Sequence, residues 1–150
     1  MNLSPNFTLA ELTVTQQPFP NDPPPAVIAK LTTLCVRVLE PIRAHYARPV
    51  RVNSGYRSPK VNAAVGSKPT SQHLLGEAAD IEIDGVTNAM LARFIRDNIA
   101  FDQVILEAYR PGIAGSGWVH VSYREGRLRH NAMTMTLGSH GATYSTGINA

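Results

Sequence analysis

The spacing of apolar and polar residues along the chain predicts a mixture of helices and short strands. Apolar residues recur with the helical period from about 24 to 47, where Pro41 should kink the helix or start a new turn. A second helix is predicted from about 87 to 98, with Thr87 as its N-cap. Thr8–Glu11 has the spacing of a capping box and predicts a short helix near the N-terminus.

Four segments have the pattern of short β-strands. Pro49–Asn53 and Ala78–Ile83 are brief runs, and the second alternates acidic with apolar side chains. Phe101–Ala108 and Trp118–Arg124 are joined by a segment rich in proline and glycine. Because proline and glycine favour a turn, we expect these two strands to form an antiparallel hairpin.

The remaining segments carry less periodic signal. Residues 54–77 have no periodicity and predict a long loop, which in a compact domain is usually functional. The last twenty residues are rich in Thr, Ser, Gly and Asn, so part of residues 125–150 should be extended and the end flexible. We expect one α+β domain over 1–150, with its core at about 7–124 and helices packed on one face of a small, mainly antiparallel sheet.

Composition narrows the class of protein. With 150 residues, 43% hydrophobic and 17% charged, the chain is typical of a folded globular domain. The net charge is +3, but the basic residues are scattered, so nucleic-acid binding is not indicated. Cys35 is the only cysteine and reads as a buried apolar residue. We see no signal peptide or membrane span, so we expect synthesis in the host cytoplasm. We also expect the protein to be a monomer.

The sharpest chemical pattern lies in Ser71–Asp80 and in a later strand. His73 ends a glycine-containing loop, Asp80 follows inside a strand, and His120 alternates with valines on another strand. Imidazole and carboxylate are ligands of catalytic zinc, and three protein ligands leave a position open for water. The sequence therefore predicts a zinc site of His73, Asp80 and His120.

The apolar neighbours of Asp80 and His120 support this prediction. A carboxylate that enters an apolar strand is costly unless it is paired or bound to a metal. The alternative is that Asp80 pairs with an arginine and His120 is a hydrogen-bonded core histidine. The three residues together favour the metal site over that alternative.

The segment Ser71–Asp80 resembles the zinc site of the D-alanyl-D-alanine carboxypeptidase family, of the peptidase M15 type. That family includes phage endolysin endopeptidases and is similar in core fold to hedgehog signalling domains. Ser54–Ser58 resembles its substrate-binding loop, Trp118–Ser122 its last ligand strand, and Phe7–Leu12 the opening of a small branch often found in phages. The resemblance covers roughly residues 7–124.

This resemblance implies the roles of several site residues. It implies that His73, Asp80 and His120 hold one zinc ion and that Arg57 contacts the substrate or its polarised carbonyl. The alternative for Arg57 is a surface arginine that structures the loop.

Three other residues are candidates for contacts in the site. Ser71 and Gln72 are candidates for substrate binding or for orienting the ligands, although loop hydrogen bonding explains them equally well. Tyr56 is a candidate for packing against a peptide or glycan, although core packing is the commoner fate of such a ring.

The general base is where this sequence departs from the resemblance. Many relatives carry an acidic residue or histidine a few positions before the last ligand, where this chain has Gly115 and Gly117. Glu107, near the end of the preceding strand, is the nearest substitute, since the hairpin should bring it opposite or close to His120. Its alternative is a rim glutamate. Asp102 is a poorer candidate, because strand parity places it on the other face.

These observations predict a zinc metallopeptidase that cuts peptidoglycan stem peptides by attack of a zinc-activated water. The bond is L-Ala-D-Glu, D-Ala-D-Ala or a cross-bridge, and the sequence does not choose among them. The expected site of action is the cell wall, after release or as part of a phage particle. One alternative is an inactive zinc-stabilised module that binds peptidoglycan or a protein. The other is a small basic nucleic-acid-binding domain, against which the dispersed charge argues.

Overall fold

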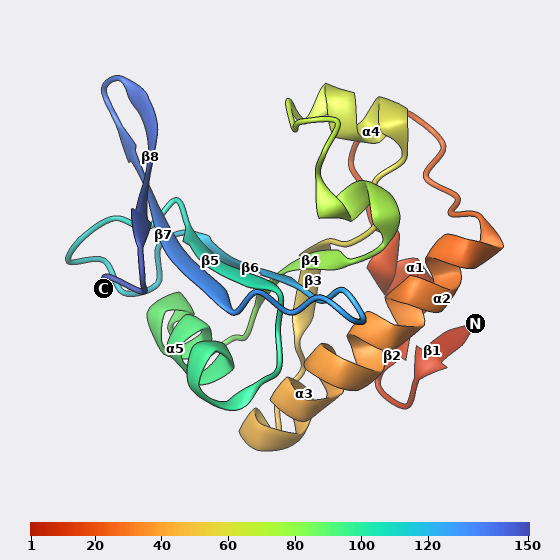
Figure 1. Ribbon diagram of the computed structural model, residues 1–150, viewed down its shortest axis with the longest axis horizontal. Coiled ribbons are helices and arrows are strands. Elements are labelled where there is room, and N and C mark those ends of the chain that lie inside the picture. Colours follow the sequence, from red (N-terminus) through yellow and green to blue (C-terminus); the bar gives the residue numbers. More distant parts are fainter.

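A six-stranded sheet runs through the centre of the computed structural model, which describes residues 1–150 (Figure 1). Neighbouring strands are antiparallel, except that the fourth and fifth in spatial order run parallel. The class and the mainly antiparallel sheet are therefore confirmed. The spatial order is β3 (Arg51–Ser54), β4 (Ala78–Glu82), β6 (Trp118–Ser122), β5 (Gln103–Glu107), β7 (Asn131–Gly138) and β8 (Gly141–Thr146).

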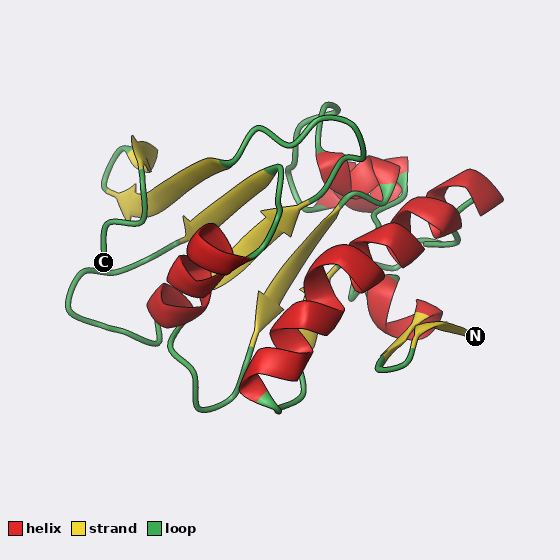
Figure 2. Ribbon diagram, turned by 60° about the horizontal axis from the view of Figure 1, so that its bottom comes forward, coloured by secondary structure: helices red, strands yellow, loops and turns green.

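The longer helices cover one face of the sheet (Figure 2). A rod of α2 (Pro25–Leu34), the π-helical turn η1 (Cys35–Leu39) and α3 (Glu40–Tyr46) lies beside α5 (Asn88–Asn98). The predicted disturbance at Pro41 is this wide turn, in which the Glu40 amide donates to the carbonyl of Cys35. Proline has no N–H to continue the α-helical pattern, so the rod accommodates it with a π-turn rather than a break.

The core lies between these helices and the sheet. Along β4, β5 and β6, alternate residues face the helices and are fully buried, because side chains of a strand point to opposite faces in turn. Cys35 is part of this core, as expected, and burial raises the pKa of its thiol to about 12. Thr87 caps α5 as predicted. The inward residues of the three strands are Ala79, Ile81, Val104, Leu106, Val119 and Val121.

The prediction of a long loop over residues 54–77 is wrong in part. It contains the short helix α4 (Pro59–Ala64) and the 3-10 turn η2 (Gln72–Leu75), which lie on the sheet face opposite the long helices (Figure 1). Ser58 caps α4 and Ser71 caps η2 through their side-chain oxygens. The helices are therefore not all on one face, and the short ones cover the face that carries the candidate site.

The two ends of the chain add small elements. The N-terminal strands β1 (Asn2–Ser4) and β2 (Phe7–Thr8) lead into α1 (Leu9–Leu12), whose capping box is confirmed. At the other end, β7 and β8 form a hairpin that joins the sheet beside β5 and extends beyond it (Figure 1). No helix has the length and apolar character needed to cross a bilayer.

Candidate metal centre

Two of the predicted metal ligands lie directly across from each other on neighbouring strands. Asp80 of β4 and His120 of β6 are Cα partners in the antiparallel ladder. Their chain neighbours point into the core, so both polar side chains project from the opposite face. This register explains how an aspartate can sit within an almost wholly buried strand: its side chain leaves the core.

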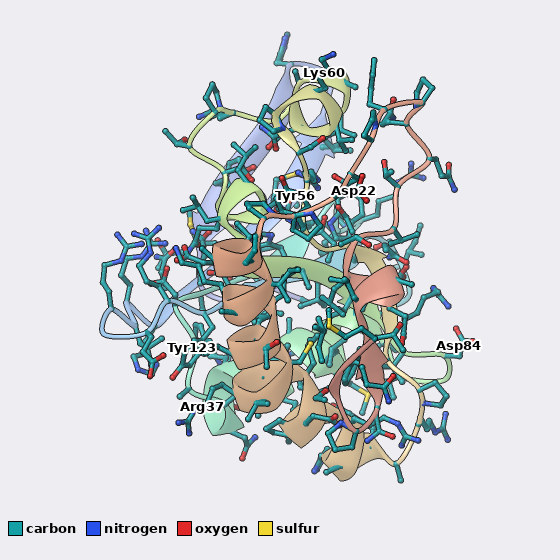
Figure 3. The ribbon with its side chains drawn as sticks, turned by 90° about the vertical axis from the view of Figure 1, so that its right-hand side faces the viewer. Asp22, Arg37, Tyr56, Lys60, Asp84 and Tyr123 are labelled. Atoms are coloured by element: carbon teal, nitrogen blue, oxygen red, sulfur yellow. The ribbon has the colours of Figure 1, made fainter.

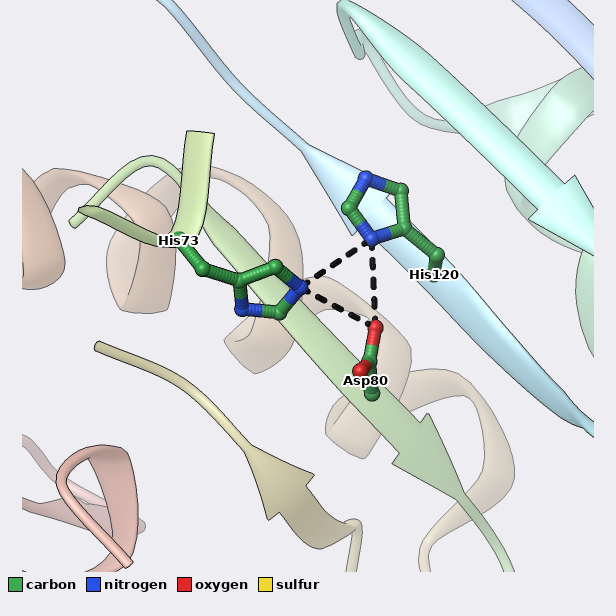
Figure 4. A group of neighbouring side chains, drawn as sticks. All are labelled: His73, Asp80 and His120. Carbon is green, nitrogen blue, oxygen red and sulfur yellow. Dashed lines mark hydrogen bonds and ion pairs between the residues drawn. The ribbon is translucent and has the colours of Figure 1, made fainter. Parts of the chain in front are cut away.

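The third ligand, His73, approaches from η2 above the sheet (Figure 4). Its Nδ1 lies 2.7 Å from the carbonyl oxygen of Gly55, so the ring donates there and presents Nε2 to the other side chains. The turn that delivers it ends at Gly76, which has a φ of 73°. A Cβ on Gly76 would lie 2.7 Å from the Val27 side chain, so glycine is required there on two grounds.

The three ligand atoms converge on one point (Figure 4). His73 Nε2 lies 3.3 Å from Asp80 Oδ1 and 3.3 Å from His120 Nδ1, and His120 Nδ1 lies 3.1 Å from Asp80 Oδ1. Ligands at about 2.0–2.1 Å from a tetrahedral zinc ion are separated by roughly 3.3 Å, so this cluster has the spacing that zinc requires. The predicted ligand set is thus brought together as a group that fits zinc.

The electrostatics of Asp80 suit a metal ligand. Burial alone would raise its pKa, but the adjacent His73 and His120 hold the pKa well below its usual range. The aspartate is therefore ionised, as a ligand must be. Arg57 Nη2 lies 3.1 Å from Asp80 Oδ2, so the arginine pairing considered as an alternative does occur. It uses the oxygen that does not face the histidines, and the two arrangements coexist.

Arg57 stands beside the metal centre and is itself oriented. Its Nε donates to Ser54 Oγ at 2.9 Å, and its side chain is only 14% exposed. Arg57 is therefore not a loose surface arginine. Two of its nitrogens are occupied, and the donors of Nη1 remain for another partner.

Glu107 lies on the same face of the sheet as the ligands, two pairs along the β5–β6 ladder from His120. In the β5–β6 ladder Glu107 is opposite Trp118, and Ile105 is opposite His120. The glutamate is thus close to His120 on a diagonal, rather than directly opposite it. Burial raises the pKa of Glu107, and the Asp80 carboxylate adds to this effect, whereas His120 and Arg57 oppose it. Its role as general base stays a prediction.

Of the two glycines that precede His120, Gly117 has a structural reason to be glycine. Gly117 has a φ of 73°, and a Cβ at this position would lie 1.9 Å from the carbonyl oxygen of Glu107. A side chain at 117 would therefore require the turn before β6 to change. Any general base supplied by this chain must come from another position.

A groove of about 810 Å³ extends from the metal centre. Its floor includes Ile105 and His120, one wall comes from the segment that connects α4 to η2, and the other comes from the β7–β8 hairpin. Neither the hairpin nor the basic loop at the groove's end was singled out from the sequence. Lys68 also lines the groove, as do five residues that the sequence did not point to: Arg124, Arg127, Arg129, Met135 and Tyr144.

The remaining candidates occupy different positions. Ser71 and Gln72 line the groove, but both side chains are also engaged within the protein. Ser71 Oγ accepts from the His73 amide, and Gln72 Nε2 donates to Asp102 Oδ2 at 3.0 Å. Tyr56 is 5% exposed and lies in the hydrophobic core, which leaves its ring little surface for a substrate.

Comparison with known proteins identifies the family of this chain. The sequence matches the profile of the Peptidase M15 family over residues 5–122, a range that includes all three ligands. The chain is 31% identical over 126 residues to the zinc D-Ala-D-Ala carboxypeptidase of Streptomyces albus G. That match covers 82% of this chain and 48% of the relative, so the chain spans about half of the relative's length.

Proposed function

Because the chain belongs to the Peptidase M15 family, we propose that it is a zinc peptidase that hydrolyses an amide bond in peptidoglycan stem peptides. The observation that carries the proposal is the convergence of His73, Asp80 and His120 at one end of a groove. The relative named as a zinc D-Ala-D-Ala carboxypeptidase supports both the metal and the substrate class. We extend the proposal to a single zinc ion and to action at the cell wall.

A zinc ion held by these residues would polarise the scissile carbonyl and lower the pKa of water. The chain's own contribution begins with holding the ligands. Gly55 fixes the ring of His73, and Arg57 holds the outer oxygen of Asp80, so the ligand atoms are oriented before metal arrives. Such partners keep the ligands aligned.

Arg57 is the group that we assign to the substrate. The free Nη1 donors can bind a terminal carboxylate or the carbonyl oxygen as it gains negative charge. A carboxypeptidase activity uses the first contact and an endopeptidase activity the second. The bond therefore stays open between D-Ala-D-Ala, L-Ala-D-Glu and a cross-bridge.

Glu107 is the group that we assign to proton transfer. It shares the ligand face of the sheet with His120, and its raised pKa is suited to taking a proton from water and passing it to the leaving amine. Gly117 has no side chain, so the position before His120 cannot supply a carboxylate in place of Glu107.

A second candidate function rests on that same glycine. If Glu107 does not act, the chain is a zinc-stabilised module that binds peptidoglycan or a protein without turnover. Its distinguishing property is that Glu107→Gln leaves wall binding and every other function unchanged.

The experiment is incubation of the zinc-loaded protein with purified peptidoglycan, with and without a chelator, while newly freed amino groups are measured. The proposal expects chelator-sensitive amine release, restored by added zinc, and mass spectrometry of the fragments then identifies the bond. Binding to the wall without amine release from several wall types supports the inactive module instead.

A further inference from the structure

The far end of the groove has an unusual charge composition. Among its lining residues are four cationic side chains, Lys68, Arg124, Arg127 and Arg129, and no aspartate or glutamate. Three of them come from the loop that follows β6, where nitrogen-bearing side chains gather next to Tyr123 (Figure 3). The fold brings Lys68, which is remote in the sequence, to the same groove as these three arginines.

The arginines of this loop are only partly neutralised. Arg127 and Arg129 share the fully buried Asp102, which thus meets two guanidinium groups with one negative charge. Arg129 holds it through two nitrogens, at 2.8 and 3.0 Å, whereas Arg127 makes a single contact at 3.3 Å. The Arg127 side chain is 47% exposed, so most of its donors are directed to solvent or to a ligand.

Arg124 likewise belongs to a group with more cations than carboxylates. It pairs with the buried Glu77, which also meets Lys30 at 3.4 Å. Glu125 lies beside Arg124 on a separate recess and does not line the groove. The wall of the groove is therefore positive on balance, and Lys68 on the opposite wall has no acidic partner.

The cationic end and Arg57 lie on different sides of the metal centre. Arg57 pairs with Asp80 and lines a recess with Asn53 and Ser54 at the β3 side, whereas the groove leaves from His120 towards β5 and β7. A peptide laid across the metal centre thus meets a cation on each side. The loop cations also lie beyond the region that matches the family, which ends at residue 122.

We propose that Lys68, Arg124, Arg127 and Arg129 bind a second carboxylate of the substrate, an internal one on the part of the peptide that does not carry the group held by Arg57. This inference rests on the proposed function. The groove suits a peptide, because Ile105 and Met135 give its lining an apolar portion for aliphatic side chains. Charge-assisted hydrogen bonds from a guanidinium to a carboxylate are roughly twice as strong as hydrogen bonds between neutral groups.

The test compares two synthetic stem peptides that differ only in whether an internal glutamate carboxyl is free or amidated. The wild type should prefer the acidic peptide in kcat/KM. Arg127→Gln and Lys68→Gln should each reduce that preference by about tenfold, the effect of one hydrogen bond to a charged group. The loss should appear in KM with kcat nearly unchanged, because the contact is remote from the reacting bond. Arg127→Lys should restore part of it.

Matched controls are available on exposed surfaces outside the groove. Lys60 on α4 and Arg37 on the helical rod are both exposed, and they lie well apart in Figure 3. Lys60→Gln and Arg37→Gln should leave the preference unchanged. An equal loss in these controls points to general attraction between a basic protein and any anion, and it overturns the proposal. Equal cleavage of the two peptides by the wild type overturns it as well.

Failure of the proposed carboxylate site can be distinguished from failure of the proposed peptidase function. If the zinc-loaded wild type cleaves neither peptide, the peptidase assignment fails, and the same variants are compared by equilibrium binding of the two peptides. Tighter binding of the acidic peptide that is weakened by Lys68→Gln and Arg127→Gln, but not by the controls, supports the site. Equal binding of the two peptides overturns it. Lys68 makes no ion pair, so its variant remains informative even where Arg127→Gln perturbs the fold.

Discussion

Asp80 and Asp102 are both buried carboxylates with lowered pKa values, but their different surroundings indicate different roles. Asp102 is saturated: Arg127, Arg129, Gln72 and a backbone amide all donate to it. Asp80 meets one guanidinium on its outer oxygen, and its inner oxygen faces two imidazoles that can bind a cation jointly. A buried charge indicates a metal site when its partners are themselves ligands, and a structural site when they are permanent cations.

The largest effect on activity is expected from a substitution of Asp80. Asp80→Asn removes the only anionic ligand, so we expect stoichiometric zinc to be lost and hydrolysis to fall roughly a thousandfold or more, beyond the 10–100-fold typical of outer partners of a metal site. Metal analysis after dialysis and amine release from peptidoglycan measure the two. Full zinc content in this variant would contradict the assigned ligand set.

Glu107→Gln should separate metal binding from proton transfer. Removal of a general base costs about 10²–10⁴-fold in rate, while the ligands of the metal stay in place. We therefore expect kcat to fall within that range and zinc content to match the wild type. Unchanged kcat with zinc bound would remove Glu107 from its role.

Asp102→Asn should act on stability rather than on chemistry. Breaking a buried ion pair costs about 3 kcal/mol in the free energy of unfolding, the low end of the usual range because Arg127 and Arg129 are 47% and 44% exposed. Zinc content and kcat per folded molecule should change little. Urea unfolding followed by circular dichroism measures the first, and a stability equal to the wild type would show that the cluster contributes nothing.

The lowered pKa of Asp102 predicts how the stability difference between the wild type and Asp102→Asn depends on pH. The guanidinium groups hold the pKa of folded Asp102 below its value in the unfolded chain, which is about 3.9. Its stabilising effect is therefore complete above about pH 4 to 5 and declines as the pH falls below that value. Unfolding curves of wild type and Asp102→Asn should converge as the pH is lowered through this window. A constant difference down to pH 2 would refute the ion-pair explanation.

A smaller loss of turnover than at Asp80 or Glu107 is expected at Arg57. Arg57→Lys retains the positive charge but loses the fork that bonds Ser54 and Asp80 together, so kcat/KM should fall by about tenfold to a hundredfold. Zinc content should stay close to that of the wild type. Steady-state kinetics on a peptide with a free C-terminal carboxylate, compared with its amide, shows whether the loss follows the terminal group.

The sequence was informative where local rules decide the outcome. Polar side chains among apolar neighbours in two predicted strands indicated Asp80 and His120, and the glycine-containing segment before β4 pointed to His73. Capping signals fixed the starts of α1 and α5, because caps depend on neighbours within three residues.

Where distant segments meet, the sequence was less informative. The amide of Tyr56 bonds the Leu12 carbonyl at 2.7 Å, a contact between remote segments that seats the ring in the core. The parallel pairing of β5 with β7 likewise has no local signature. Arg127 and Arg129 converge on Asp102 and Arg124 on Glu77, and neither ion pair has a local signature in the sequence.

The most direct test of the zinc assignment is a crystal of the zinc-loaded protein, measured with X-rays on either side of the zinc absorption edge. A single anomalous peak should lie about 2.0–2.2 Å from His73 Nε2, Asp80 Oδ1 and His120 Nδ1. A protein that carries stoichiometric zinc with its peak elsewhere, or with no peak at these atoms, would contradict the account.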